Sequence, residues 1–162
     1  MQTNDFQKAQ SAAFTGHRYI SYGKYPILKV TLRQRIRTLY AQGIRNFYCG
    51  MAIGFDMLAA ETILSLKTEL QGLTLIAVIP YCNQSEKWSD TNRSRYNAIL
   101  CKTDKTILLS KDYYKGCLLR RNDYMLSHSC HIIAYFDGNN EGGTFYTCRK
   151  ATELNLPVTN IF

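Results

Sequence analysis

CGMAIGFD, residues 49–56, joins an apolar run to a helical pattern through two glycines. The run Arg45 to Cys49 is typical of a buried strand, and Phe55 to Leu70 carries apolar residues at helical spacing. A strand, a glycine turn and a helix in this order form the unit from which a parallel α/β sheet builds a site for a phosphate-bearing ligand. The stretch therefore predicts such a sheet, with a ligand site at this turn.

Two further stretches have the same arrangement, FTGHR at residues 14–18 and EGGT at residues 141–144. Both lie where a predicted strand passes into a loop or helix. Because the carboxyl ends of parallel strands meet at one edge of a sheet, we expect these loops to converge. The sequence thus predicts one cleft that contains the first-strand loop, residues 50–56, Arg121 and Gly143-Thr144.

Apolar runs and helical patterns alternate along the whole chain. The predicted strands are 11–15, 45–49, 74–79, 105–109, 131–136 and 157–161, and the predicted helices are 27–42, 55–70, 92–101, 118–127 and 143–155. This alternation predicts an α/β fold with three α/β/α layers and a mostly parallel sheet of about six strands. The length of 162 residues suits a single domain, 11–162, preceded by a loose polar lead, 1–10.

Composition narrows the class of protein and its partners. The chain is 46% hydrophobic and 20% charged, without the ~20-residue apolar run of a membrane helix, and its start does not read as a signal peptide. The six cysteines lack a C-x-x-C spacing, which favours reduced thiols and a cytoplasmic location. The net charge of +8 favours anionic partners such as nucleotides, phosphorylated metabolites or nucleic acid.

The loops offer groups that suit a phosphate or a sugar, and each group also has a structural reading. Arg18 is a natural anion clamp, and His17 is expected to bind more readily than to catalyse. Asp56 suits a ribose hydroxyl or only complements its helix dipole, and Thr144 suits a phosphate or caps its helix. We predict ligand contacts from Thr15, Gly16, His17, Arg18, Gly50, Ala52, Gly54, Asp56, Pro80, Gln84, Arg121, Asn122, Gly142, Gly143 and Thr144.

Several other stretches bear on the site. Adjacent helical residues cannot face the same way, so at most one of Arg120 and Arg121 is expected to point into the cleft. The irregular, aromatic-rich stretches 19–26, 81–91 and 110–115 are candidates to cover a ligand, although packing is favoured for Trp88. Residues 128–131 contain His and Cys, but they straddle a helix end and a strand start, so no metal site is predicted.

The order of these motifs resembles the YpsA-like family of the SLOG superfamily, a Rossmann-like group that also contains DprA and the LOG phosphoribohydrolases. The matching stretches are 15–18, 50–56 with Ala60-Glu61, 79–81 with Asn83-Gln84 and Trp88, Arg95-Tyr96, 121–125, and 142–144. The resemblance implies a Rossmann-like sheet and a nucleotide or nucleotide-derived ligand related to NAD or ADP-ribose.

The LOG branch implies a sharper alternative, cleavage of a nucleotide N-glycosidic bond. Its motif resembles R-K-x-x-M followed by P-G-G-x-G-T-x-x-E. Here Arg121 to Met125 matches the first part with Asn122 in place of Lys, but Thr147 stands where the second part has Glu. The catalytic candidates are therefore Asp56 or Glu61 beside the sugar and Arg121 on the phosphate.

Three hypotheses of function follow. The favoured one is a module that binds a small nucleotide ligand; no cofactor beyond such a ligand and no membrane is implied, and the oligomer considered is a homodimer. The first alternative is the nucleotide N-glycosidase or phosphoribohydrolase. The second is single-stranded nucleic-acid binding of the DprA type, which the charge of +8 and the twelve tyrosines fit.

Overall fold

Six strands form one parallel sheet in the computed structural model, which describes the backbone of residues 2–162 and the side chains of residue 5 and residues 7–162. Every neighbouring pair runs parallel, and the spatial order is β4-β3-β2-β1-β5-β6. The strands are β1 (Ser11–Gly16), β2 (Asn46–Cys49), β3 (Thr74–Ile79), β4 (Lys105–Leu108), β5 (His131–Tyr135) and β6 (Val158–Asn160). The predicted fold class is thereby confirmed.

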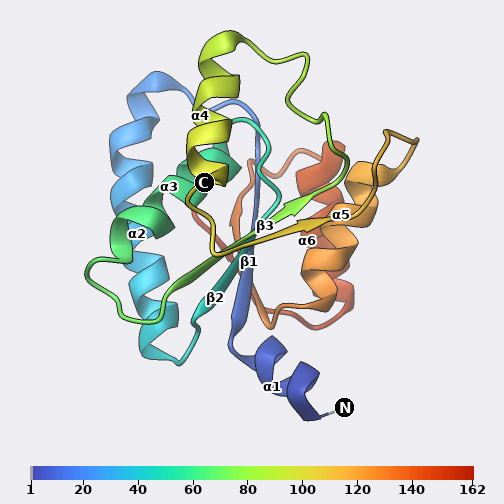
Figure 1. Cartoon of the computed structure of the whole chain (residues 1–162). Coiled ribbons are helices and arrows are strands. Elements are labelled where there is room, and N and C mark those ends of the chain that lie inside the picture. The colour runs from blue at the N-terminus through green and yellow to red at the C-terminus, as the bar shows by residue number, and fades with distance from the viewer. Residues whose placement is uncertain (1) are drawn as a thin grey trace.

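Helices cover both faces of this sheet and complete three layers (Figure 1). One face carries α2 (Tyr25–Ala41), α3 (Phe55–Leu66) and α4 (Asp90–Leu100), and the other carries α5 (Cys117–Ser127) and α6 (Gly142–Glu153). A short 3₁₀ turn, η1 (Tyr22–Lys24), leads into α2. Each predicted helix forms within a few residues of its expected bounds.

The central strand β1 is buried on both sides, as its sequence requires. Ala12 and Phe14 pack into the core beneath α2 and α3, while Ala13 belongs to the smaller core beneath α5 and α6. Successive residues of a strand point to opposite faces, so a strand between two helical layers is apolar at every position. The apolar runs that predicted the strands have this cause.

The segment 1–10, expected to be a loose lead, instead contains helix α1 (Gln2–Ala9). Contacts at its carboxyl end join it to the sheet: the Ser11 hydroxyl donates to the Gln7 carbonyl at 2.6 Å, and the Cys130 thiol donates to the Ala9 carbonyl at 3.4 Å. The Ser11 contact is local and the Cys130 contact is tertiary, and together they hold the carboxyl end of a short polar helix that has little stability alone.

The direction of the strand order changes at β1. Strands β2, β3 and β4 follow one another on one side of it, and β5 and β6 lie on the other. In open α/β sheets, ligands bind in the crevice outside the carboxyl ends of the strands at such a switch point. Here the end of β1 lies beside the end of β5, where Gly16 is paired with Tyr135.

The search for membrane-crossing segments covered the described residues, and none of their helices is long and apolar enough to span a bilayer.

Candidate functional site

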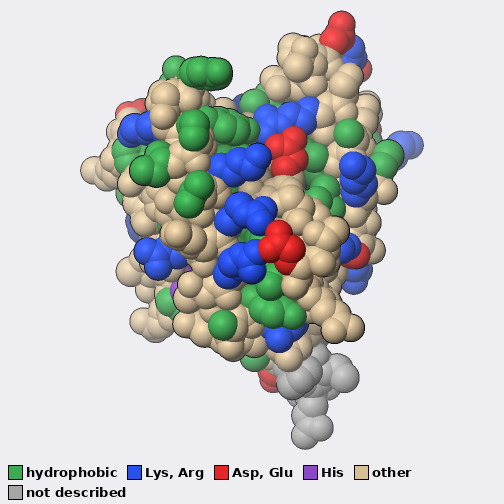
Figure 2. Space-filling view, turned by 90° about the vertical axis from the view of Figure 1, so that its left-hand side faces the viewer, with side chains coloured by type: hydrophobic (Ala, Val, Ile, Leu, Met, Phe, Trp, Pro, Cys, Tyr) green, Lys and Arg blue, Asp and Glu red, His purple; other side chains and the backbone are tan. Residues whose placement is uncertain are grey.

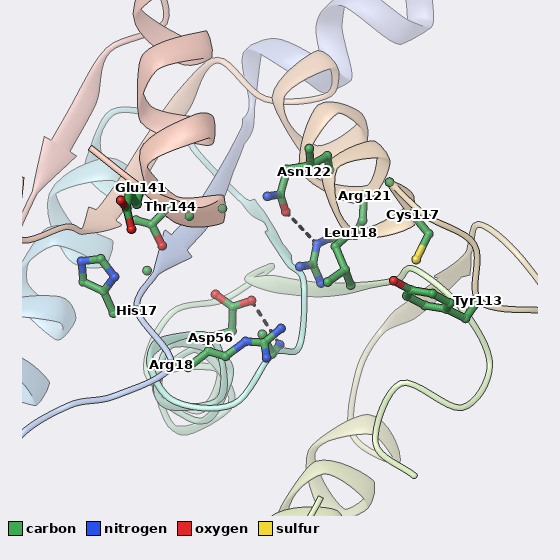
Figure 3. A pocket seen from close by; sticks show the side chains of 16 residues that line it. His17, Arg18, Asp56, Tyr113, Cys117, Leu118, Arg121, Asn122, Glu141 and Thr144 are labelled. Atoms are coloured by element: carbon green, nitrogen blue, oxygen red, sulfur yellow. Dashed lines mark hydrogen bonds between the residues drawn. The ribbon is translucent and has the colours of Figure 1, made fainter. Parts of the chain in front are cut away.

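A cavity of about 490 Å³ lies at this switch point, and we call it the switch-point cavity. Its walls come from the loop after β1, the loop after β2, the start of α5 and the start of α6 (Figure 3). The lining residues are Gly16, His17, Arg18, Ala52, Asp56, Tyr113, Gly116, Cys117, Leu118, Leu119, Arg121, Asn122, Glu141, Gly142, Gly143 and Thr144. The predicted convergence of the three loops with Arg121 is confirmed.

Arg121 is the central charged group of this cavity. It is 6% exposed, and its guanidinium donates to the Gly50 carbonyl at 2.6 Å and to the Asn122 side-chain oxygen at 2.8 Å. None of the ion pairs among the described side chains includes Arg121. Both hydrogen-bond partners are neutral, so the positive charge has no carboxylate in direct contact.

Burial without an ion-pair partner changes the pKa of Arg121. Desolvation lowers the pKa of the Arg121 guanidinium, and the charge of Asp56 opposes this shift. An arginine stays protonated in proteins, so burying its charge lowers the stability of the folded state. Arg120 points the other way, donating to the Leu109 carbonyl and the Tyr114 hydroxyl on the surface, as the helical phase predicts.

Asp56 faces Arg121 from the first turn of α3. It is 5% exposed, and its Oδ2 accepts the Ala52 N–H at 3.2 Å (Figure 3). Burial raises the pKa of the Asp56 carboxyl, while Arg121, the Ala52 N–H and Arg18 each act to lower it. A carboxyl with a raised pKa at the wall of a cavity can hydrogen-bond a ligand hydroxyl or exchange a proton with it.

The loop after β1 brings two cationic or titratable side chains to the same cavity. His17 and Arg18 both line it, and Arg18 takes part in none of the ion pairs of the described side chains. His17 already engages Asp137, with Nε2 2.9 Å from the carboxylate. Arg18 is therefore the freer of the two for an anion.

Helix α6 starts at the wall of the cavity. Gly142, Gly143 and Thr144 line it, and the N-cap residue Glu141 makes no side-chain hydrogen bond to the helix. The first N–H groups of a helix have no partner inside it and carry a partial positive charge, so they favour an anion. Figure 3 places Thr144 on the same side of the cavity as His17.

The glycines of the second loop serve the protein's own packing. A Cβ at Gly50 would lie 2.6 Å from the Arg121 guanidinium, and one at Gly54 would overlap the backbone carbonyl of Arg18. Gly54 also has φ +87°, which favours glycine. We expected these glycines to approach a ligand; instead they admit Arg121 and the loop after β1, which places both arginines at the cavity.

Five predicted contacts do not line the switch-point cavity. Thr15 is buried, and Gly50 and Gly54 lie against Arg121 and the Arg18 backbone, which do line the cavity. Gln84 lines a second cavity beside it, and Pro80 lines neither cavity.

Glu61 is the correction among the catalytic candidates. It lies on the outer side of α3, in a separate surface groove, where both carboxylate oxygens accept from Arg95 at 2.6 and 2.7 Å. Glu61 does not line the switch-point cavity, and with both oxygens engaged by Arg95 it has no support from the structure as a catalytic candidate. Thr147, which stands in the place of the LOG glutamate, is buried and donates its hydroxyl to the Gly143 carbonyl.

Sequence reasoning missed the wall formed by the start of α5. Tyr113, Cys117 and Leu118 line the cavity without having been predicted as contacts. The only signal was the aromatic-rich stretch 110–115, which contains Tyr113. The chain crosses from β4, at one edge of the sheet, to β5 on the other side of β1. The local sequence of this crossover does not indicate which wall of the cavity it forms.

The residues with metal-binding side chains at 128–131 point apart. The His128 ring stacks on Tyr124 with centroids 4.0 Å apart, while His131 hydrogen-bonds Thr159 at 2.8 Å. Among the residues that the structure describes, no group of three or more His, Cys, Asp or Glu side chains could hold a metal ion.

Comparison with known families gives one clear match. The model of the YspA SLOG family matches residues 15–158, which span all of the loops described above.

Curated relatives and a solved structure agree with this match. The chain is 28% identical over 129 residues to a UPF0398 protein of Brevibacillus brevis, covering 78% of this chain and 69% of that protein. It is 26% identical over 132 residues to a UPF0398 protein of Halalkalibacterium halodurans, covering 80% and 67%. A structure of DNA processing protein A from Helicobacter pylori superposes with a TM-score of 0.65 at 20% identity, covering 98% of this chain and 67% of that one. This last likeness concerns the fold alone.

Proposed function

Because the chain belongs to the YspA SLOG family, we propose that it binds a nucleotide or nucleotide derivative in the switch-point cavity, through the phosphate groups of that ligand. The fold is of the kind found in nucleotide- and nucleic-acid-binding proteins, and the position at a topological switch point is where such sheets hold their ligands.

One observation carries the proposal: the buried guanidinium of Arg121 faces the cavity with only neutral hydrogen-bond partners. A buried cation is costly unless an anion offsets it, and arginine matches the geometry of phosphate oxygens. Asp56 approaches without forming an ion pair, so an external anion has a place beside Arg121.

Two further features favour an anion in the same cavity. Arg18 enters from the loop after β1, and the uncapped start of α6 contributes N–H groups at Gly142 and Gly143. These cationic groups come from three separate elements, which is the arrangement expected of a built phosphate site rather than of a surface charge cluster.

Calorimetric titration of the protein with AMP, ADP, ADP-ribose, NAD and adenosine tests this proposal. We expect the phosphorylated ligands to bind and adenosine to bind much more weakly. Arg121→Ala should weaken the phosphorylated ligands about ten- to a hundredfold, since hydrogen bonds to charged groups contribute about 1.5–3 kcal/mol.

Arg120→Ala is the matched control, because it removes the neighbouring arginine that points to the surface. Equal losses in the two variants, or equal binding of adenosine and AMP by the unmodified protein, would contradict the phosphate clamp.

Asp56 favours a second candidate, hydrolysis of a nucleotide N-glycosidic bond. Its place on the cavity wall suits a carboxylate that stabilises a cationic sugar centre, and its raised pKa suits a general base that activates water. Chromatography of each ligand mixture for free base tests this candidate. Base released by the unmodified protein and not by Asp56→Asn would establish hydrolysis. A ligand that stays intact would favour binding without hydrolysis.

Single-stranded nucleic acid is the other ligand to include, because the H. pylori neighbour is described by its single-stranded DNA binding mode. A short single-stranded DNA belongs in the same titration. Affinity that falls steeply with salt would favour this reading over a small nucleotide.

A further inference from the structure

A second cavity of about 420 Å³ adjoins the switch-point cavity, and we call it the adjoining cavity. The two share a boundary formed by Arg18, Ala52, Tyr113, Leu118 and Arg121. Both arginines therefore face both cavities. A ligand held by them has room to extend in two directions.

The two ends of this double cavity differ in chemistry. The far wall of the switch-point cavity is the start of α6, which favours an anion. The adjoining cavity is lined by Tyr81 and Trp88, by Tyr113 on the shared boundary, and by the charged Glu86 and Lys87 at its own end. One end thus suits a phosphate, and the other suits a flat ring.

Tyr81 and Tyr113 form a right-angled corner. Their ring centroids are 5.3 Å apart, with an interplanar angle of 78°. Such a corner offers a base one ring face on which to stack and a second ring against its edge. Tyr113 is 64% exposed, so it fills no core position that would explain its place. Trp88, by contrast, packs edge-on against Tyr96, as its sequence context predicts.

Gln84 adds a polar group to the same compartment. It is 7% exposed and lines the adjoining cavity. Its amide nitrogen lies near the Gly50 and Met51 carbonyls and the Tyr96 hydroxyl, at 3.3–3.5 Å. The side-chain oxygen accepts none of the hydrogen bonds of the described residues, which leaves an acceptor for an amine or N–H of a base.

We infer that the adjoining cavity is the base compartment of the site, and that the ligand is a nucleoside diphosphate or a molecule built on one. The base stacks on Tyr113, the inner phosphate lies at Arg18 and Arg121, and the outer phosphate lies at the start of α6. The arginine pair and the start of α6 are two anion-binding groups in one cavity, and a diphosphate offers each of them a phosphate of its own. This inference rests on the proposed function and adds the ligand class and its direction in the site.

The test is calorimetric titration with inorganic pyrophosphate, the four common nucleoside diphosphates and their monophosphates. The variants are Tyr113→Ala and Tyr113→Phe, with Tyr114→Ala as the matched control because Tyr114 lines neither cavity. Tyr113 is exposed, so its replacement leaves the core intact.

We expect the best nucleoside diphosphate to bind about tenfold more tightly than pyrophosphate and than its own monophosphate. Tyr113→Ala should remove about tenfold from nucleoside diphosphate affinity, the size of a base–aromatic stack, and nothing from pyrophosphate affinity. Tyr113→Phe and Tyr114→Ala should keep the affinity.

Three results would overturn the inference while leaving the proposed function in place. They are a monophosphate that binds as tightly as its diphosphate, pyrophosphate that binds as tightly as every nucleoside diphosphate, and a Tyr113→Ala variant with unchanged affinity. Absence of binding by all nucleotides and by pyrophosphate would instead overturn the proposed function itself, and this inference with it.

Discussion

Three arginines of the outer helical face and the two arginines of the cavity are used in opposite ways. On the face formed by α2, α3 and α4, Arg33 and Arg37 both pair with Glu69, and Arg95 pairs with Glu61. Figure 2 shows blue and red side chains lying next to one another on this side of the molecule. In the switch-point cavity, Arg18 and Arg121 belong to none of the ion pairs of the described side chains.

The difference indicates which charges are available to a ligand. Arg33, Arg37 and Arg95 already have carboxylate partners, and each such surface pair contributes little to stability. Arg121 is the most buried arginine and has no such partner, although burial makes an unpaired charge most costly there. Net charge alone cannot distinguish these two groups, because both count equally toward it.

The largest expected effect comes from the packing that holds the cavity arginines in place. Gly54→Ala should lower the free energy of unfolding by about 3 kcal/mol, because it adds a strained backbone to a clash with the Arg18 carbonyl. Gly43→Ala should cost about 1–2 kcal/mol, since Gly43 also has positive φ but nothing lies within 4 Å of its would-be Cβ. Urea unfolding of both variants measures the two costs.

The difference between these two variants isolates the close approach of the loops at the cavity. If Gly54→Ala and Gly43→Ala lose the same stability, backbone strain explains both, and the tight contact between the first two loops contributes nothing. Loss of nucleotide binding should accompany Gly54→Ala alone.

The next effect concerns the buried carboxyl of the cavity. Burial raises the folded-state pKa of Asp56, so the folded protein holds this proton more readily than the unfolded chain does. Stability from this group is therefore present at low pH and is lost as pH rises from the ordinary Asp pKa of about 3.9 through the raised folded-state pKa. Asp56→Asn has no carboxyl to ionise at this position, so we expect it to be more stable than the unmodified protein at neutral pH.

Urea midpoints of the two proteins measured across this pH range give the comparison. We expect them to converge in acid and separate as pH rises. Parallel curves would mean that Asp56 is not desolvated in the folded protein, and its candidacy as an acid or base would lose its physical basis.

The smallest effect belongs to the outer face. Hydrogen bonds from Arg33 and Arg37 lower the pKa of the exposed Glu69 carboxyl. Its contribution to stability is present above the unfolded Glu pKa of about 4.3 and is lost as pH falls through the lowered folded-state pKa. Glu69→Gln should therefore lower the melting temperature slightly at neutral pH, less so in high salt, and leave nucleotide affinity unchanged. A loss of affinity in this variant would remove the distinction between the two groups of arginines.

The sequence predicted the centre of the sheet well because strands β1, β2, β3 and β5 are buried on both faces. Strand β3, for example, has the predicted bounds, since an apolar run stops at Pro80, which cannot continue a ladder. The glycines also predicted the turns between strand and helix. Helix α1 was not predicted, because part of what holds it is a contact from the distant Cys130 to Ala9.

The site was predictable only where it follows directly from strand ends. The adjacency of Arg120 and Arg121 predicted that at most one of them points inward, and the packing of α5 makes Arg121 that residue. The candidacy of Glu61 was avoidable: residues five apart on a helix lie about 140° apart around its axis, so Asp56 and Glu61 cannot face the same cavity. The wall that contains Tyr113 depends on the long crossover from β4 to β5, for which the aromatic-rich stretch 110–115 was the one local signal.

A crystal structure of the protein with ADP tests the central claim most directly. The account predicts phosphate oxygens within hydrogen-bonding distance of the Arg121 guanidinium and of the first N–H groups of α6, with the base against Tyr113. ADP bound elsewhere, for example among the paired arginines of the α2–α4 face, with Arg121 still bonded only to Gly50 and Asn122, would contradict it.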